Sequence, residues 1–290
     1  LSEKNGYTII YFDVKKNLII IEKDCKGLEI TEEYTAFDLC MTKGGYDEVF
    51  DKYFKMMDIT PRITEKRTGY TSWYNHYQDI SGDIIKENIN SVVSSSFKFD
   101  VFQIDDGYQT AIGDWLSIDQ KKFPNGMKGI ASLIKENNMI PGIWLAPFSC
   151  EKNSEVFKNH PDWLVKDSNG EPLRVGSNWS GFFALDIYNC EVRTYIKNTF
   201  DTIINEWGYE LVKLDFLHSA CILPLYNKTR GQIMCEAMDF LRECVGDKLI
   251  LGCGVPLLPS FGKVDYCRIG TDISLEWDDK PFMRLLHRER

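Results

Sequence analysis

The pattern of apolar and polar positions changes near Gly69. Beyond that point short apolar runs alternate with stretches of helical spacing, and this alternation predicts βαβ units that share a parallel sheet. The predicted strands are Thr68–Tyr74, Phe99–Asp106, Pro141–Pro147, Phe182–Ile187, Glu210–Phe216, Lys248–Gly254 and Val264–Gly270. The predicted helices are Gly82–Phe97, Met127–Asn137, Cys190–Trp207 and Thr229–Cys244. Phe182–Ile187 is the weakest strand, because no clear helix separates it from the strand before it.

Six or seven such strands in series favour a (β/α)₈ barrel over a doubly wound sheet. A dinucleotide-binding sheet would carry a glycine-rich phosphate turn after its first strand. The segment 72–82 (SWYNHYQDISG) follows the first predicted strand here and has no such turn. The predicted fold class is therefore α/β, with a TIM-type barrel.

The first 60 residues have a different texture. Tyr7–Val14 and Asn17–Lys23 are β-rich runs that predict a hairpin, and Ala36–Thr42 is a further candidate strand. Gly44–Met57 has the apolar spacing of a helix, and Pro61 follows it. Residues 1–60 thus read as the end of a β-domain with a linking helix, and 61–290 as a second domain.

Composition narrows the class of partner. The 290 residues are 43 % hydrophobic and 27 % charged, which is ordinary for a globular chain of one large or two smaller domains. The net charge of −9 disfavours nucleic acid as a partner. No apolar run approaches the roughly 18 residues that would span a bilayer, so no membrane contact is expected. The nine cysteines form no C-x-x-C pair, which favours reduced thiols and a cytoplasmic protein.

Acidic residues stand at the ends of several predicted strands: Asp105, Asp186, Asp215 and Asp272. In a barrel, the carboxyl ends of the strands face the active site. Any one of these residues could instead cap the following helix. Several at one rim make capping a poorer explanation for the whole set.

Strand alternation puts Lys213 and Asp215 on the same face of their strand. If that face is the barrel interior, the ammonium keeps Asp215 ionised, which suits a nucleophile toward a sugar carbon. The alternative is a buried Lys213–Asp215 ion pair with a structural role only. The pattern alone leaves both open.

Asp105 and Asp106 are adjacent carboxylates that suit either a metal ion or the vicinal hydroxyls of a sugar. No further oxygen ligands follow them in a calcium-type loop, and the pair alone does not decide. Arg268 and Asp272 lie on another predicted strand end, so Asp272 is a candidate acid or base partner for Asp215, or a turn cap. Among the tryptophans, Trp73 and Trp144 lie nearest strand ends and are the best candidates to stack on a sugar. For any single tryptophan a core position is the more common outcome.

These motifs resemble one family. SWYN, FQIDDGYQ with GDW, GIWLAPF, LVKLDF and RIGTD occur in the order found in family 36 glycoside hydrolases, the microbial α-galactosidases. The resemblance runs over roughly Asp58 to Asp279. It implies a retaining hydrolase that removes terminal α-linked galactose from oligosaccharides, with no metal and no cofactor. Family members are often oligomers, so a homo-oligomer is a further expectation.

The resemblance also implies roles. Asp215 would be the nucleophile and Asp272 the acid/base, with Asp105 and Asp106 accepting hydrogen bonds from O4 and O6 of galactose. The remaining implied substrate contacts are Lys213 and Arg268 at ring hydroxyls, Trp73 and Trp144 as pocket walls, and Cys253 beside the 2-substituent.

Two expectations concern the extent of the chain and its activity. By resemblance, residues 1–60 would be the C-terminal part of a β-sandwich, and the barrel would stop after its sixth strand, within a helix at Phe282–Arg290. Two alternatives to hydrolysis stay open at this point: a galactosyl transferase of the raffinose-synthase type, and a non-catalytic sugar-binding fragment.

Overall fold

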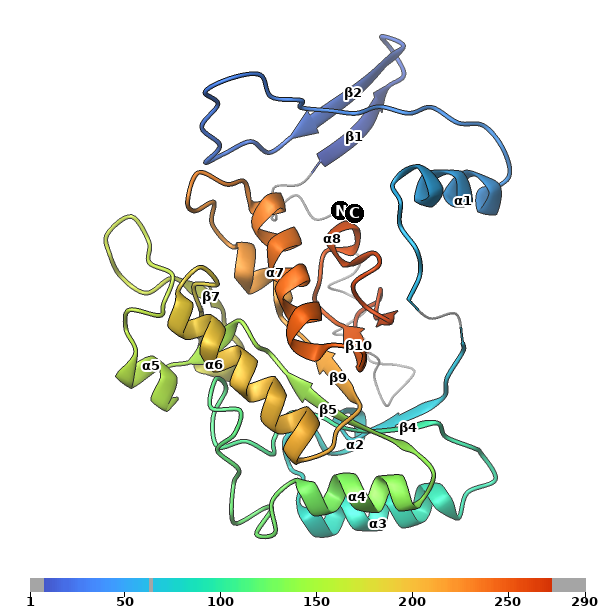
Figure 1. Ribbon diagram of the computed structural model, residues 1–290, viewed down its shortest axis with the longest axis vertical. Helices are drawn as coiled ribbons and strands as arrows, with labels where there is room; N and C mark the ends of the chain where they lie inside the picture. Colours follow the sequence, from blue (N-terminus) through green and yellow to red (C-terminus); the bar gives the residue numbers. More distant parts are fainter. Residues whose placement is uncertain (1–7, 63–64, 273–290) are drawn as a thin grey trace.

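A curled parallel sheet forms the centre of the protein. The computed structural model describes residues 8–62 and 65–272. Within them six strands pair in the order β11-β10-β9-β5-β4-β3, and all five pairings are parallel (Figure 1). The strands are β3 (Gly69–Thr71), β4 (Val101–Ile104), β5 (Ile140–Leu145), β9 (Leu211–Leu214), β10 (Leu249–Gly252) and β11 (Tyr266–Cys267). Six of the seven predicted strands of the barrel region are therefore confirmed, each shorter than its apolar run.

The two edges of this sheet approach one another. Arg62, in the segment that leads to β3, lies 3.2 Å from the carboxylate of Asp265 beside β11. The hydroxyl of Tyr266 in β11 donates to the carbonyl oxygen of Glu65 at 3.2 Å. These contacts join the segment before β3 to β11, the two edge strands of the sheet. Such contacts are expected when a sheet curls into most of a barrel, and not when it stays open.

Helices cover the outside of the sheet: α3 (Gly82–Val93), α4 (Lys128–Glu136), α6 (Cys190–Asp201) and α7 (Arg230–Val245). In Figure 1, α3 and α4 lie side by side, and α6 packs next to α7. Their starts follow from local chemistry: the Ser81 side chain accepts from Ile84 N–H, and Thr229 and Gln232 form a reciprocal capping box. All four predicted helices are confirmed, and α6 continues into a π-helical turn at Thr202–Glu206.

Phe182–Ile187 does not join the barrel sheet. Its strand, β8 (Phe182–Ala184), lies between β6 (Ser149–Glu151) and β7 (Arg174–Gly176) in a separate antiparallel sheet. The prediction of a barrel strand there was wrong, since β5 and β9 pair directly and leave no room between them. Asp186 is therefore not at the end of a barrel strand, contrary to the prediction. Its carboxylate accepts hydrogen bonds from the backbone N–H of Tyr188 and from the hydroxyl of Tyr226.

In the N-terminal region, β1 (Thr8–Asp13) and β2 (Leu18–Lys23) form the predicted antiparallel hairpin, and α1 (Tyr46–Met56) is the predicted helix. The strand expected at Ala36–Thr42 is not formed. In the described part of the chain no strand pairs with it, and a strand without a pairing neighbour leaves its backbone groups without sheet partners. Phe54 of α1 meets Phe261 edge to face at 5.2 Å.

The shorter elements are α2 (Trp73–His76), α5 (Glu155–Asn159) and α8 (Leu257–Ser260), with 3₁₀ turns at Asn178–Ser180 and Leu217–Cys221. The helix expected at Phe282–Arg290 lies outside the described residues. Searching the described residues for a helix of sufficient length and apolarity to cross a membrane finds none.

Candidate active site

The carboxyl ends of the parallel strands bring most of the predicted site residues to one rim. Trp144 of β5 pairs in register with Lys213 of β9, and Lys213 pairs with Leu251 of β10. Asp105 follows β4, Asp215 follows β9 and Cys253 follows β10. Because parallel strands end at the same edge of a sheet, these side chains converge although they are far apart in sequence.

Lys213 binds Asp105 across the barrel interior. Its Nζ lies 2.7 Å from Oδ2 of Asp105, and the two residues are only 6 % and 2 % exposed. The same oxygen accepts from the side chains of Gln103 at 2.7 Å and Thr71 at 3.3 Å. Burial alone would lower the pKa of Lys213, but the Asp105 carboxylate stabilises the ammonium and holds that pKa above its ordinary value.

The alternative of a direct Lys213–Asp215 ion pair is wrong, because Lys213 pairs with Asp105. Lys213 and Asp215 stand two residues apart on one strand, whereas a residue on a nearby strand faces Lys213 directly across the curled sheet. The charge of Asp215 still acts on Lys213, as a weaker influence than Asp105.

Asp106 is held by three side-chain donors. Gln78 donates to its Oδ2 at 2.7 Å, the indole N–H of Trp179 donates to the same oxygen at 3.0 Å, and Gln109 donates to Oδ1 at 2.6 Å. Burial raises the pKa of Asp106 and outweighs these hydrogen bonds, and the nearby Asp105 adds to the rise.

The glycine of the D-D-G motif is explained by this packing. Gly107 has φ +120°, and a Cβ there would lie 2.6 Å from the carbonyl oxygen of Gln78. Only glycine accommodates both the backbone angle and the close approach. The approach brings the side chain of Gln78 to the Asp106 carboxylate, so one of the donors to Asp106 comes from a second segment of the chain.

Asp215 lies among donors at the end of β9. The indole N–H of Trp144 donates to its Oδ2 at 3.3 Å, and the backbone N–H of Phe216 donates to its Oδ1 at 2.7 Å. Phe216 has φ 51°, in the left-handed region. Gly254, with φ +56°, faces this pair so closely that a Cβ would lie 2.9 Å from Asp215 Oδ1.

Cys253, Arg268 and Asp272 complete the rim. Burial raises the pKa of the Cys253 thiol, and the negative charge of Asp215 raises it further. Arg268 forms an ion pair with Asp272. Burial would lower the pKa of Arg268, but the nearby sulfur of Cys253 and the negative charges of Asp272 and Asp215 together hold it above its ordinary value.

Two further tryptophans lie near the rim residues. Trp73 is half-buried in α2 and packs on Tyr77 at 5.2 Å. Trp115 is 1 % exposed and packs edge to face on Trp144 at 5.7 Å. Among the described residues its buried indole N–H has no hydrogen-bond partner.

The functional contacts that sequence reasoning missed are Gln78, Gln109 and Trp179. Gln109 lies three residues after Asp106, so an inspection of the residues next to Asp106 in the sequence could have found it. Trp179 lies 73 residues away, in the loop between β7 and β8, where no pattern in the sequence points toward Asp106. Within the described ranges, no group of three or more His, Cys, Asp or Glu residues is arranged to hold a metal ion.

A curled parallel sheet with carboxylates, a lysine and indoles at its carboxyl edge defines a barrel-type protein whose polar rim offers several hydrogen-bond acceptors and donors. The chain belongs to the Melibiase family, whose model matches residues 44–231. The fold class is thereby supported as part of a TIM-type barrel, and the family resemblance of the motifs is confirmed.

Individual relatives agree with this assignment. TtGalA, an α-galactosidase from Thermus thermophilus solved with stachyose, is 37 % identical with a TM-score of 0.71, and the match covers 82 % of this chain and 50 % of that one. The bifunctional α-galactosidase/sucrose kinase AgaSK of Mediterraneibacter gnavus is 24 % identical over 63 % of this chain and 20 % of its own length. The α-galactosidase AgaA of Geobacillus stearothermophilus is 27 % identical over 49 % of this chain and 20 % of its own length. The chain thus spans about a fifth of these two curated relatives and half of TtGalA.

Proposed function

We propose that this chain carries the active site of a retaining α-galactosidase that releases terminal galactose from α-galactosides. The observation that carries the proposal is Asp215. Its carboxylate stands at the barrel rim between two N–H donors, and two cations, Lys213 and Arg268, lie near enough to interact with it. Family membership supports the same activity.

In the proposed mechanism, Asp215 attacks the anomeric carbon of galactose and the bond to the leaving oxygen breaks. Asp272 gives its proton to that oxygen and then takes a proton from water. The water attacks the anomeric carbon, releases Asp215 and yields galactose with its configuration retained. This pathway requires the two carboxyl groups to stand about 5–5.5 Å apart when substrate is bound. The ion pair of Asp272 with Arg268 supports its assignment to the same rim.

Recognition of the sugar is assigned to the buried acceptor pair and the aromatic residues. Asp105 and Asp106 are proposed to accept hydrogen bonds from O4 and O6. A carboxylate offers about four acceptor positions, and three donors reach Asp106 in the free chain, so one position remains for a hydroxyl. The unpartnered indole N–H of Trp115 is proposed as a donor to the sugar.

The other proposed contacts follow the family resemblance: Lys213 and Arg268 at ring hydroxyls, Trp73 and Trp144 as walls, and Cys253 at the 2-position. The division into a β-sandwich end at 1–60 and a barrel at 61–290 is likewise a proposal. The hairpin of β1 and β2 supports its first part. The protein is further proposed to work without a metal, as a cytoplasmic enzyme that can form homo-oligomers.

The experiment is hydrolysis of an aryl α-galactoside by the 290-residue chain and by Asp215→Ala and Asp272→Ala. Removing a catalytic side chain lowers turnover by several orders of magnitude. Asp83→Ala is the control, because the Asp83 side chain is 92 % exposed on α3. We expect turnover by the parent and the control and near-complete loss in the two site variants.

Two results would contradict the proposal in different ways. Turnover that survives Asp215→Ala would remove the nucleophile assignment. A parent chain that binds galactose but never releases the aryl group would favour the non-catalytic sugar-binding alternative. Adding a sugar acceptor tests the transferase alternative, because a transferase would yield mainly a new galactoside instead of free galactose.

A further inference from the structure

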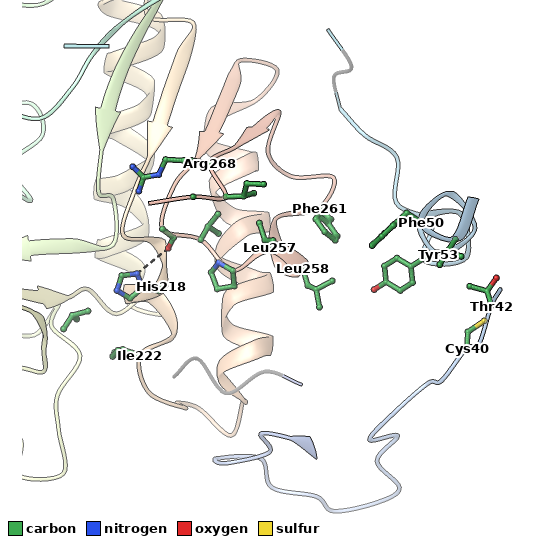
Figure 2. A pocket seen from close by; sticks show the side chains of 17 residues that line it. Cys40, Thr42, Phe50, Tyr53, His218, Ile222, Leu257, Leu258, Phe261 and Arg268 are labelled. Carbon is green, nitrogen blue, oxygen red and sulfur yellow. Dashed lines mark hydrogen bonds between the residues drawn. The ribbon is translucent and has the colours of Figure 1, made fainter. Parts of the chain in front are cut away.

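An apolar groove runs outward from the candidate active site. Figure 2 shows it between the loop that follows β10 and helix α1. Its volume is about 1020 Å³, the upper end of the range of small-molecule pockets. Its inner end is lined by His218, Gly254 and Arg268, and its outer end by Phe50 and Tyr53 of α1.

The inner end of the groove is lined by Gly254 and Arg268, which adjoin the two proposed catalytic carboxylates. Gly254 faces Asp215, since a Cβ at Gly254 would lie 2.9 Å from its Oδ1. The backbone N–H of His218 donates to the carbonyl oxygen of Gly254 at 3.3 Å, which fixes the turn after Asp215 to this wall. On the other side, Arg268 lines the groove and forms the ion pair with Asp272.

The walls beyond this end are apolar and partly open to water. Leu257 and Leu258 are each 41 % exposed, and Phe50 is 40 % exposed. Helix α1 has no fully buried residue, although one of its faces is aromatic. Large apolar side chains gathered around a cavity mark a binding surface, because covering them removes apolar area from water.

The direction of the groove identifies its occupant. This step rests on the proposed function, in which Asp272 protonates the leaving oxygen. A general acid must lie within hydrogen-bond reach of the atom that it protonates. The leaving group therefore begins beside Asp272, and Arg268, Ile269 and Gly270, which line the groove, lead up to that residue. Arg268 carries the permanent charge of the lining, and its charge is balanced by the ion pair with Asp272, so the groove fits a neutral body.

We infer that the groove binds the leaving group of the substrate and selects α-galactosides with an apolar aglycone, such as an alkyl chain or an aromatic ring. The galactose would occupy the polar pocket inside the barrel, and the aglycone would extend over Leu257 and Leu258 toward α1. A second sugar as leaving group would gain less from these walls, since its hydroxyls find few polar partners there.

The test compares kcat/KM for methyl, butyl and hexyl α-galactosides with that for a disaccharide carrying terminal α-galactose. A fully buried methylene raises binding about fourfold, and half burial in an open groove raises it about twofold. We expect about a 30-fold rise in kcat/KM from methyl to hexyl, with hexyl ahead of the disaccharide. Equal values for methyl and hexyl, or a higher value for the disaccharide, would overturn the inference while the hydrolase assignment stands.

Leu258→Ser tests the location, with Leu116→Ser as the matched control. Leu116 is 36 % exposed, similar to Leu258, and does not line the groove. The hexyl-to-methyl ratio should fall at least about threefold in Leu258→Ser and stay unchanged in Leu116→Ser. Equal ratios in both variants would place the alkyl chain elsewhere.

A chain that hydrolyses none of these galactosides would refute the proposed function and not, by itself, the groove. Affinity then decides, measured by tryptophan fluorescence with methyl and hexyl α-galactosides. Tighter binding of hexyl that Leu258→Ser abolishes supports the groove. Equal affinities, or sedimentation showing that a second copy of the chain covers the groove, overturn it.

Discussion

Replacing Gly254 with alanine tests how tightly the structure constrains Asp215. The new Cβ would lie 2.9 Å from Asp215 Oδ1 and 3.0 Å from the backbone N of Phe216. Ordinary contacts begin near 3.4 Å, so the carboxylate must move by about 0.5 Å or turn away from the Phe216 N–H. Either movement displaces the proposed nucleophile.

The magnitude has two parts. A left-handed backbone at a non-glycine residue costs about 1–2 kcal/mol, which lowers the melting temperature by about 2–8 °C in a chain of this size. Misplacing a reacting group by 1 Å can cost a hundredfold in rate, so a shift of half that size should lower kcat about tenfold or more. KM should change little, since the sugar-binding side chains are not touched.

Gly246→Ala is the matched control. Gly246 has φ +63°, close to the +56° of Gly254, but a Cβ there would meet no atom within 4 Å. Thermal unfolding and steady-state hydrolysis of an aryl α-galactoside should show similar destabilisation in the two variants and a fall in kcat only in Gly254→Ala. Equal kcat values in both would refute the claim that Gly254 positions Asp215.

Three further predictions follow from charged groups. Lys213→Met leaves the buried Asp105 carboxylate without its cation, so the free energy of unfolding in urea should fall by about 3–5 kcal/mol, and adding Asp105→Asn should restore much of it; strictly additive losses would contradict this. Burial lowers the pKa of His218, so its ring should titrate by NMR below the ordinary 6.5. The unfolding free energy should accordingly fall as the pH drops from 6.5 toward that midpoint, because the unfolded chain binds the proton first; a midpoint above 6.5 would be inconsistent. Asp24→Asn removes the negative charge that two Arg230 donors reach at 2.8 and 3.1 Å, and limited proteolysis should then cut the N-terminal region faster; an unchanged rate would show that this ion pair does not hold the hairpin region to α7.

The barrel strands could be predicted from sequence because each is a short apolar run, and the central strands β4, β5 and β9 are buried on both faces. The exception, Phe182–Ile187, is equally apolar but pairs in the small antiparallel sheet. Burial alone gives the same pattern in both environments, and only the direct pairing of β5 with β9 distinguishes them. The failed strand at Ala36–Thr42 has a related cause, since the formation of a strand depends on a neighbour that composition does not reveal.

The site was predictable where chemistry and strand ends coincide. Asp105, Asp106 and Asp215 were chosen as candidates because a carboxylate directly after an apolar strand costs desolvation free energy unless it is paired or binds a ligand. The partners were harder: Lys213 was expected at Asp215 and binds Asp105, because contacts across a barrel depend on the curl of the sheet. Trp179 reaches Asp106 from a loop, and periodicity carries no information about such a contact.

The central claim is that Asp215 forms a covalent bond to galactose. The direct measurement is to incubate the chain with a fluorinated galactosyl fluoride of α configuration, whose glycosyl-enzyme breaks down slowly, and to locate the adduct by mass spectrometry of the digested protein. The account predicts one galactosyl adduct on Asp215, and its loss in Asp215→Ala. An adduct on another carboxylate, or none in a chain that hydrolyses the aryl α-galactoside, would contradict it.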